Sequence, residues 1–189
     1  ASYTQQEKLT IARMLLDEVG VDRIEIASAR VSEGEKTAVS RVMDWARERG
    51  YQDRIEVLGF TDISRSVDWI VESGARVMNL LTKGSMEHLT KQLRKTPEEH
   101  VADIKETVEY AESRGVHTNI YFEVWSNGMI ESPDYVWFLL QKLKDTAIRR
   151  FMLPDTLGIL SPGQVTDFIT ETVKRYPSLH FDFHGHDDY

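Results

Sequence analysis

The sequence contains no cysteine, which removes several kinds of chemistry at once. A chain without thiols forms no disulfide, has no thiolate nucleophile and builds no cysteine-ligated zinc or iron–sulfur site. Any metal that the chain binds must therefore be held by His, Asp or Glu side chains.

Long apolar runs and an excess of positive charge are also missing. No stretch approaches the roughly 20 apolar residues that cross a bilayer, and the polar residues that follow Ala1 are unlike a signal peptide. The 23 Lys and Arg residues are outnumbered by 31 Asp and Glu residues, and the resulting net charge of −8 argues against general nucleic-acid binding. We therefore expect a cytoplasmic protein with no membrane and no nucleic-acid partner.

One local group of cations departs from this acidic balance. It consists of Lys83, Lys91, Arg94 and Lys95. Such a cluster could contact a phosphorylated ligand, but a solvated surface is the commoner explanation for a charge run of this kind. The sequence leaves both interpretations open.

Apolar runs rich in β-branched residues recur along the chain, and a segment with helical periodicity separates each run from the next. The predicted strands are 23–27, 54–60, 76–82, 117–124, 150–154 and 180–184. Alternating strands and helices imply a parallel sheet, either open and doubly wound or closed into a barrel. No glycine-rich phosphate loop follows any strand, and polar residues crowd the strand ends, so we favour an α/β fold of the (β/α)8 TIM-barrel class.

The number of elements bears on the extent of the domain. Six strands and six helices predict that residues 1–189 are one catalytic TIM-barrel domain, and only part of it. One strand is expected before Thr4, and a helix, the last strand and the last helix are expected after Tyr189. Helix starts are marked by a capping side chain, followed by Pro at the first helical position or by Glu or Gln three residues later; these capping residues are Thr4, Thr96, Ser132 and Ser161.

The histidines at the end of the last predicted strand give the clearest chemical signal. His184 and His186 are two residues apart, so their side chains face the same side of a strand. Two imidazoles with one carboxylate are a common ligand set for a catalytic divalent ion, although ordinary hydrogen-bonded histidines show the same spacing. Asp187 and Asp188 follow at once and could add a ligand, accept a bond from a ring N–H, or cap the next helix.

Other strand ends also carry polar groups. In the run 119–125, alternation predicts that Tyr121, Glu123 and Trp125 share a face, where Glu123 could act as a general base or simply reach solvent. Thr156 and its neighbour Asp155 end another strand, where they could line a site or serve in a turn. Glu25 and Asn79 lie on further strands, and we expect them to join one ring of polar groups around the barrel mouth.

Three motifs of the sequence are informative when they are considered together. They are the stretch 89–99, Pro-Asp-Thr-Leu-Gly at 154–158 and His-Gly-His-Asp-Asp at 184–188. In this order they resemble the family of acyl-CoA-dependent barrel synthases that contains the 2-isopropylmalate, homocitrate and citramalate synthases, with the hydroxymethylglutaryl-CoA lyases more distant. The resemblance covers the whole chain. It implies a (β/α)8 barrel that condenses acetyl-CoA with a 2-oxo acid in a Claisen reaction assisted by Zn²⁺, Mn²⁺ or Mg²⁺.

The resemblance also implies roles for individual residues. His184 and His186 match the two histidine ligands of the metal. Glu123 matches the glutamate tied to deprotonation of the acetyl methyl group, and Thr156 matches the threonine that holds the carboxylate of the 2-oxo acid. The resemblance to the family further implies a homodimer.

Substrate choice depends on three apolar or aromatic residues. Tyr121 stands where isopropylmalate and homocitrate synthases usually carry a small serine, and Leu58 and Leu81 match pocket positions of one type of citramalate-forming member. Motifs at 80–85 and 125–128 resemble the same type. The resemblance therefore implies that pyruvate is the acceptor and (R)-citramalate the product, on a branched-chain amino-acid pathway. Exclusion by size discriminates by only about 1–3 kcal/mol per methylene, so selectivity should be partial.

Two departures from the family pattern qualify this interpretation. The Arg-Asp-Gly run that supplies the third metal ligand is absent, so we expect that ligand before residue 1 and no full activity from residues 1–189 alone. Asp187 stands where most members have asparagine. The alternatives are a 2-isopropylmalate or homocitrate synthase, a related metal-dependent acyl-CoA lyase or aldolase, and a catalytically silent barrel that binds metal or CoA.

Overall fold

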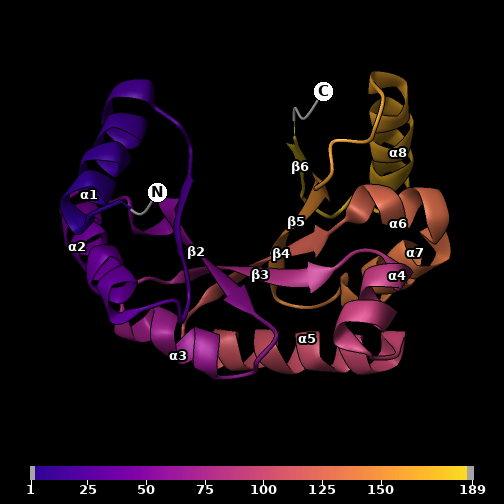
Figure 1. The fold of residues 1–189 in the computed structure, drawn as a ribbon, viewed down its shortest axis with the longest axis horizontal. Coiled ribbons are helices and arrows are strands. Elements are labelled where there is room, and N and C mark those ends of the chain that lie inside the picture. Colours follow the sequence, from indigo (N-terminus) through magenta and orange to yellow (C-terminus); the bar gives the residue numbers. More distant parts are fainter. Residues whose placement is uncertain (1–2, 187–189) are drawn as a thin grey trace.

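Six parallel strands form a single curved sheet in the computed structural model, which describes residues 3–186. The strands are β1 (Ile24–Ser28), β2 (Ile55–Phe60), β3 (Val77–Lys83), β4 (His117–Glu123), β5 (Ile148–Asp155) and β6 (Phe181–Gly185). They lie side by side in the order of the sequence, and every neighbouring pair is parallel. A doubly wound sheet would reverse its order partway. The predicted barrel class is therefore confirmed, with the six strands forming a curled part of its wall (Figure 1).

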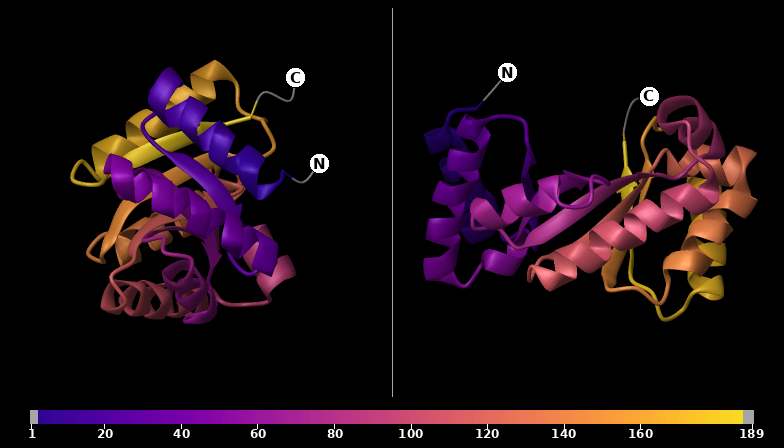
Figure 2. Two further views of the ribbon diagram at one scale, coloured as in Figure 1. Left: turned by 90° about the vertical axis from the view of Figure 1, so that its left-hand side faces the viewer. Right: turned by 90° about the horizontal axis from the view of Figure 1, so that it is seen from below.

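The helices cover the convex side of this wall. Figure 2 shows α1 and α2 at one end of the molecule and α7 and α8 at the other, while α5 lies along the outside between them. The longer helices are α1 (Gln5–Arg13), α2 (Glu33–Arg49), α3 (Arg65–Glu72), α5 (Pro97–Ser113), α7 (Pro133–Leu143) and α8 (Pro162–Arg175). Shorter elements complete the connections: η1 (Met14–Val19), η2 (Gln52–Arg54), α4 (Met86–His88), η3 (Leu89–Leu93) and α6 (Trp125–Glu131).

Local capping chemistry explains where several helices begin. Thr4, Thr96 and Ser161 each accept a bond from the backbone N–H three residues on, and the side chain at that position bonds back to the capping residue. These three predicted caps are confirmed. Ser132 differs, because its hydroxyl makes no cap bond to α7 and instead accepts a bond from the N–H of Met86 at 3.3 Å.

Two glycines allow three segments to meet behind the strand ends. A Cβ on Gly128 of α6 would lie 2.0 Å from the carbonyl oxygen of Gly84, and a Cβ on Gly84 would lie 2.5 Å from the carbonyl oxygen of Phe122. Neither distance is compatible with a real side chain. The end of β3, the end of β4 and the first turns of α6 can therefore pack this closely only because both positions are glycine.

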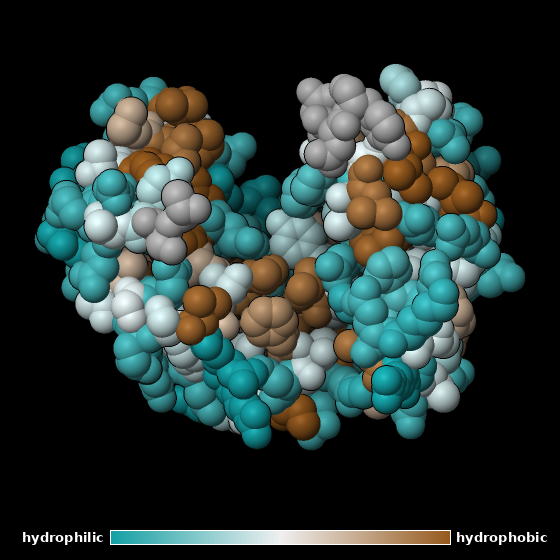
Figure 3. Space-filling view, viewed as in Figure 1, coloured by the Kyte–Doolittle hydropathy of each residue, from teal (hydrophilic) through white to brown (hydrophobic). Residues whose placement is uncertain are grey.

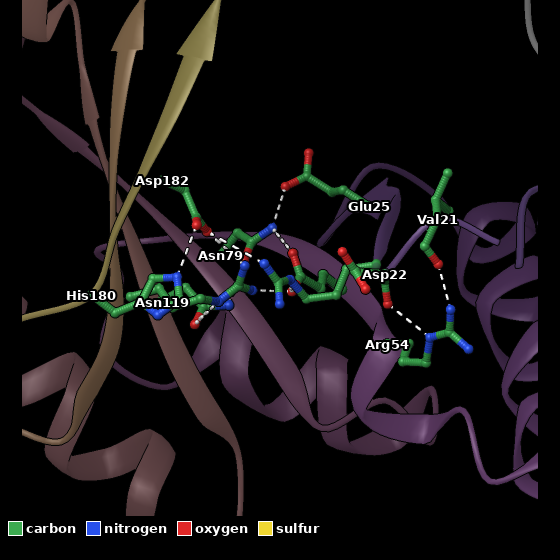
Figure 4. Close-up of polar contacts among 11 residues, drawn as sticks. Val21, Asp22, Glu25, Arg54, Asn79, Asn119, His180 and Asp182 are labelled. Atoms are coloured by element: carbon green, nitrogen blue, oxygen red, sulfur yellow. Dashed lines mark hydrogen bonds and ion pairs between the residues drawn. The ribbon is translucent and has the colours of Figure 1, made fainter. Parts of the chain in front are cut away.

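A partly buried network of charges ties strands together inside the concave wall. Arg150 on β5 pairs with Glu56 on β2 and, at 2.8 Å, with Asp182 on β6. Asn79 donates to Glu56 at 2.9 Å and to Glu25 at 2.7 Å (Figure 4). The side chains of Glu56 and Arg150 are only 7% and 12% exposed, so removing either one would leave the other charge largely desolvated and unpaired, which typically costs about 3–5 kcal/mol. The network therefore fixes the relative positions of non-adjacent strands.

The concave side of the wall is hollow. Figure 3 shows a deep notch between the two arms of the molecule, with apolar surface on its floor and mostly hydrophilic surface outside. In residues 3–186, no helix combines the length and apolar character that a membrane crossing requires.

The glycine contact yields a first prediction. Replacing Gly128 with Ala should lower the free energy of unfolding by about 1–3 kcal/mol or more, because backbone atoms of Gly84 must move away from the new methyl group. Gly163 in α8 is the matched control, since a Cβ there meets nothing within 4 Å. Its change to Ala should be neutral or stabilising by up to about 1 kcal/mol. Urea denaturation of the full-length variants measures both effects, and equal midpoints would contradict the packing argument.

Candidate active site

One cavity of about 200 Å³ collects the residues that the sequence singled out. All seven predicted site residues line it, and they come from β2, β3, β4 and β6 and from the positions just after β5 and β6. They are Leu58, Leu81, Tyr121, Glu123, Thr156, His184 and His186. Glu25 from β1 and Pro154 from β5 complete the lining. Because the strands are parallel, their carboxyl ends meet at one rim, and this is the end of a barrel where active sites are built.

The Glu123 carboxylate does not stand alone in this cavity. Its Oε2 forms an ion pair with the ammonium group of Lys83, the residue directly opposite it in the register of β3 and β4. The side chain of Lys83 is 14% exposed and that of Glu123 is 29% exposed, so water screens the pair only partly. This role of Lys83 was not predicted, and the signal that could have found it is its position at the end of the neighbouring strand.

Thr156 is placed by the turn that follows Glu123. Its Oγ1 accepts a hydrogen bond of 2.9 Å from the backbone N–H of Val124, which leaves the hydroxyl hydrogen available for another acceptor. Val124 has a left-handed conformation with φ 62°, unusual for a β-branched residue. This turn directs Trp125 away from the face of Glu123 and into contact with the rings of Phe168 and Phe183. The predicted common face for Trp125 is therefore wrong.

Asp155 serves the loop rather than the cavity. Its carboxylate accepts bonds from the N–H groups of Ile159 at 3.1 Å and Leu160 at 3.0 Å. Burial alone would raise the pKa of Asp155, but these backbone donors outweigh it and hold the pKa below its ordinary value. The turn interpretation is thus correct for Asp155, and only its neighbour Thr156 faces the cavity.

The two histidines lie close together on the cavity wall. The rings of His184 and His186 are stacked, with centroids 4.9 Å apart and an interplanar angle of 25°. Desolvation, and secondly the neighbouring His186, lowers the pKa of His184, which favours the neutral imidazole that binds metals. Two imidazoles from one strand fit a divalent ion of the zinc or manganese class as part of its ligand set. Within residues 3–186, no group of three or more His, Asp or Glu side chains is arranged to hold a metal. Asp187 and Asp188 lie outside the described residues.

The side of the cavity formed by Tyr121, Leu58 and Leu81 is aromatic and aliphatic. The Tyr121 ring lies 5.8 Å from the ring of His184, and desolvation raises the pKa of its hydroxyl to about 12. Tyr121 therefore stays neutral and occupies space beside the histidines. Leu58 and Leu81 are half-buried and line the same cavity, so this side presents carbon surface rather than charge.

Glu25 and Asn79, two polar residues that we expected at the barrel mouth, differ in whether they line the cavity. Glu25 lines the cavity as expected, although it is the second residue of β1 and not at that strand's carboxyl end. Although Glu25 keeps an exposed surface, the surrounding protein desolvates it and raises its pKa, with the nearby Glu56 adding to the effect. Asn79 is 1% exposed and lies near the start of β3, where it bonds to Glu25, Glu56 and Asn119. The expectation that Asn79 belongs to the mouth is therefore wrong.

The predicted cation cluster is divided among separate carboxylates. Lys91 pairs with Glu87 at 2.5 Å, Lys95 pairs with Asp103, and Lys83 pairs with Glu123 inside the cavity rim. These partners favour the solvated-surface interpretation for Lys91 and Lys95.

A buried histidine supports the end of β3 from behind. His100 on α5 is fully buried, and its Nε2 accepts a hydrogen bond of 3.2 Å from the backbone N–H of Lys83. Desolvation lowers its pKa from 6.5 to about 4. The acceptor role requires an unprotonated Nε2, so the packing around Lys83 depends on neutral His100.

The described residues form part of a parallel α/β barrel whose rim carries a carboxylate, a hydroxyl and a pair of imidazoles. Comparisons with known proteins identify the family within this class. The model of the HMGL-like family matches residues 1–189. The chain therefore belongs to the HMGL-like family.

Two curated relatives and one solved structure illustrate the kinship. A Methanopyrus kandleri protein named "Putative (R)-citramalate synthase CimA" is 31% identical over 100% of this chain and 35% of its own length. A homocitrate synthase of Sulfolobus acidocaldarius is 28% identical over 98% of this chain and 39% of its own length. The HMG-CoA lyase of Bacillus subtilis shares the fold with a TM-score of 0.75 at 21% identity, over 99% of this chain and 63% of that one. The chain thus spans less than half the length of these two curated relatives.

His100 gives a prediction about pH. The folded pKa lies below the unfolded value of 6.5, so the folded state binds fewer protons and loses stability as pH falls from 6.5 towards 4. Between about pH 7.5 and about pH 5, the free energy of unfolding should fall by about 2 kcal/mol more in the wild type than in His100→Gln, which keeps an acceptor. Denaturant titrations of both full-length proteins provide the measurement. Parallel pH dependences would show that His100 is not the group responsible.

Proposed function

We propose that the protein containing this chain condenses acetyl-CoA with a small 2-oxo acid, with pyruvate preferred and (R)-citramalate as product. The observation that carries the proposal is the gathering of all seven predicted site residues around one cavity of about 200 Å³. A cavity of this size is below the range of about 300–1,000 Å³ typical of pockets for larger ligands. It suits a small acid, and the names of the relatives supply the reaction class.

The first chemical task is to generate a carbon nucleophile. In the proposal Glu123 accepts a proton from the methyl group of acetyl-CoA, and the electron pair left on that carbon attacks the keto carbon of the acceptor. The keto oxygen then takes up a proton, and water hydrolyses the thioester, which releases the product acid and free CoA. Its carboxylate faces the cavity from the end of β4, where the partial exclusion of water keeps it available to substrate rather than to bulk solvent.

The second task is to hold the acceptor in place. Thr156 already accepts a bond from Val124, so its own O–H can donate to the acceptor's carboxylate. His184 and His186 would serve as ligands of a divalent ion, Zn²⁺, Mn²⁺ or Mg²⁺, which when bound polarises the keto group and stabilises the alkoxide that forms. Orientation of this kind contributes to the rate by removing the entropy cost of bringing the reactants together.

The third task is to select the acceptor. Tyr121, Leu58 and Leu81 line the cavity with carbon surface and leave no charge for a second carboxylate. A methyl group fits such a surface, whereas the larger side chain of 2-oxoisovalerate or the charged one of 2-oxoglutarate is disfavoured. This argument favours citramalate formation over the isopropylmalate and homocitrate alternatives. A homodimer in the cytoplasm, the product's place in amino-acid biosynthesis and the single-domain boundaries remain predictions.

A coupled assay tests the proposed reaction directly. Full-length protein with acetyl-CoA and a divalent salt should release free CoA, detected with a thiol reagent, fastest with pyruvate and more slowly with 2-oxobutyrate. Tyr121→Ser should shift preference towards larger acceptors by about 10-fold, because it opens space beside His184. A clear wild-type preference for 2-oxoisovalerate or 2-oxoglutarate would exclude citramalate formation in favour of the other synthases, and acetyl-CoA production from a 3-hydroxyacyl-CoA would favour the lyase.

Metal retention supplies a second test. His184→Ala should release the bound ion during dialysis and lose turnover, whereas Glu123→Gln should keep the ion and lose turnover alone. His180→Ala is the matched control, because His180 lies beside the same strand but pairs with Asp182 at 3.0 Å and does not line the cavity. Metal content per protein is measured by mass spectrometry. Full metal content in His184→Ala would remove this residue from the ligand set.

A further inference from the structure

The side chain of Lys83 occupies an unusual position for a lysine. It is the last residue of β3 and pairs with Glu123 across the β3–β4 register. Only 14% of its side chain is exposed, whereas that of Lys91 in a surface pair is 73% exposed. A lysine side chain loses rotamer entropy when it is held in one conformation. The attraction between the two charges, in a place that water reaches only partly, must offset this entropy cost.

The backbone around Lys83 is fixed on every side. Its N–H donates to His100, and its carbonyl oxygen accepts a bond of 3.1 Å from the hydroxyl of Tyr135. The next N–H, that of Gly84, donates to the carbonyl oxygen of Glu123 at 2.7 Å. His100 and Tyr135 are both buried. The end of β3 is therefore connected to Glu123 twice, once through the backbone N–H of Gly84 and once through the charged group of Lys83.

These two connections restrict the position of the Glu123 carboxylate. The flexible side chain of Glu123 would rotate if it were unpaired, but the ammonium group holds Oε2 in one place. No hydrogen bond from the described residues reaches Oε1, and Glu123 lines the cavity. Oε1 is thus the oxygen available to a substrate.

We propose that Lys83 is a positioning residue, which holds Oε2 of Glu123 so that Oε1 meets the acetyl methyl group. This inference rests on the proposed function. In the step concerned, a methyl C–H bond breaks, its proton moves to Oε1, and its electron pair remains on the carbon that attacks the acceptor. Lys83 exchanges no proton in this step and contacts no substrate. Its contribution is the geometry of the base, for which a displacement of about 1 Å lowers a rate by about 100-fold.

A double-mutant cycle tests the inference in the full-length protein. Lys83→Met should lower kcat by about 10- to 100-fold with little change in KM for the acceptor, and Lys83→Arg should recover part of the loss. In a Glu123→Gln background, Lys83→Met should have no further effect, because Lys83 acts only through the carboxylate. Lys91→Met is the matched control and should leave kcat unchanged.

Two kinetic outcomes would overturn the inference. One is an unaltered kcat in Lys83→Met. The other is a loss that is the same size with and without the Glu123 carboxylate, which indicates a general effect on the fold.

A second measurement separates this inference from the proposed function. The ¹³C carboxyl resonance of Glu123, assigned by its disappearance in Glu123→Gln, should shift in Lys83→Met and stay unchanged in Lys91→Met. An inactive wild type in which this shift occurs refutes the proposed function but not the pairing of the two residues. An active wild type whose kcat is the same in Lys83→Met refutes only the positioning role, and an inactive wild type without the shift refutes both.

Discussion

The backbone contact between the ends of β3 and β4 is the constraint on which the site depends. The N–H of Gly84 bonds to the carbonyl oxygen of Glu123, and α6 packs against this junction at a distance that only glycine permits. Once the two strand ends are joined in this way, Lys83 and Glu123 must face each other. The turn at Val124 then begins α6 and brings its N–H to Thr156. The positions of the Glu123 carboxylate, of its partner Lys83 and of the Thr156 hydroxyl therefore follow from one packing arrangement.

Charge is distributed over the barrel interior in two layers. Deep in the wall, Arg150 joins the carboxylates of Glu56 and Asp182, and every member of the group has a partner. At the rim, Glu123 has one oxygen paired and the other facing the cavity. A fully paired network confers rigidity, whereas a partly paired carboxylate remains able to react. The same residue types thus serve structure in one layer and, in our proposal, chemistry in the other.

Sequence patterns predicted the six strands and three of the four proposed caps because both depend on local periodicity and local hydrogen bonds. Strand-end patterns also pointed to Glu123, Thr156 and the two histidines, since parallel strands bring their carboxyl ends together, whereas Leu58 and Leu81 were singled out only by the family resemblance. The Lys83–Glu123 pair was not predictable in this way, because it depends on the register between two strands. The predicted face of Trp125 was wrong because the alternation of a strand stops at the left-handed turn of Val124. The predicted place of Asn79 at the mouth was wrong because β3 continues to Lys83, which leaves Asn79 near its start.

The Arg150 network separates the stability of the wall from the residues that line the cavity mouth, so the two can change independently. Arg150 links β2, β5 and β6 through Glu56 and Asp182, so none of its ion pairs involves Tyr121, Leu58 or Leu81. In our proposal these three residues at the strand ends select the acceptor, so exchanges there alter which acceptor fits without removing an ion pair of the wall. In our proposal, exchanges at the mouth therefore change substrate choice and leave every ion pair of the Arg150 network in place.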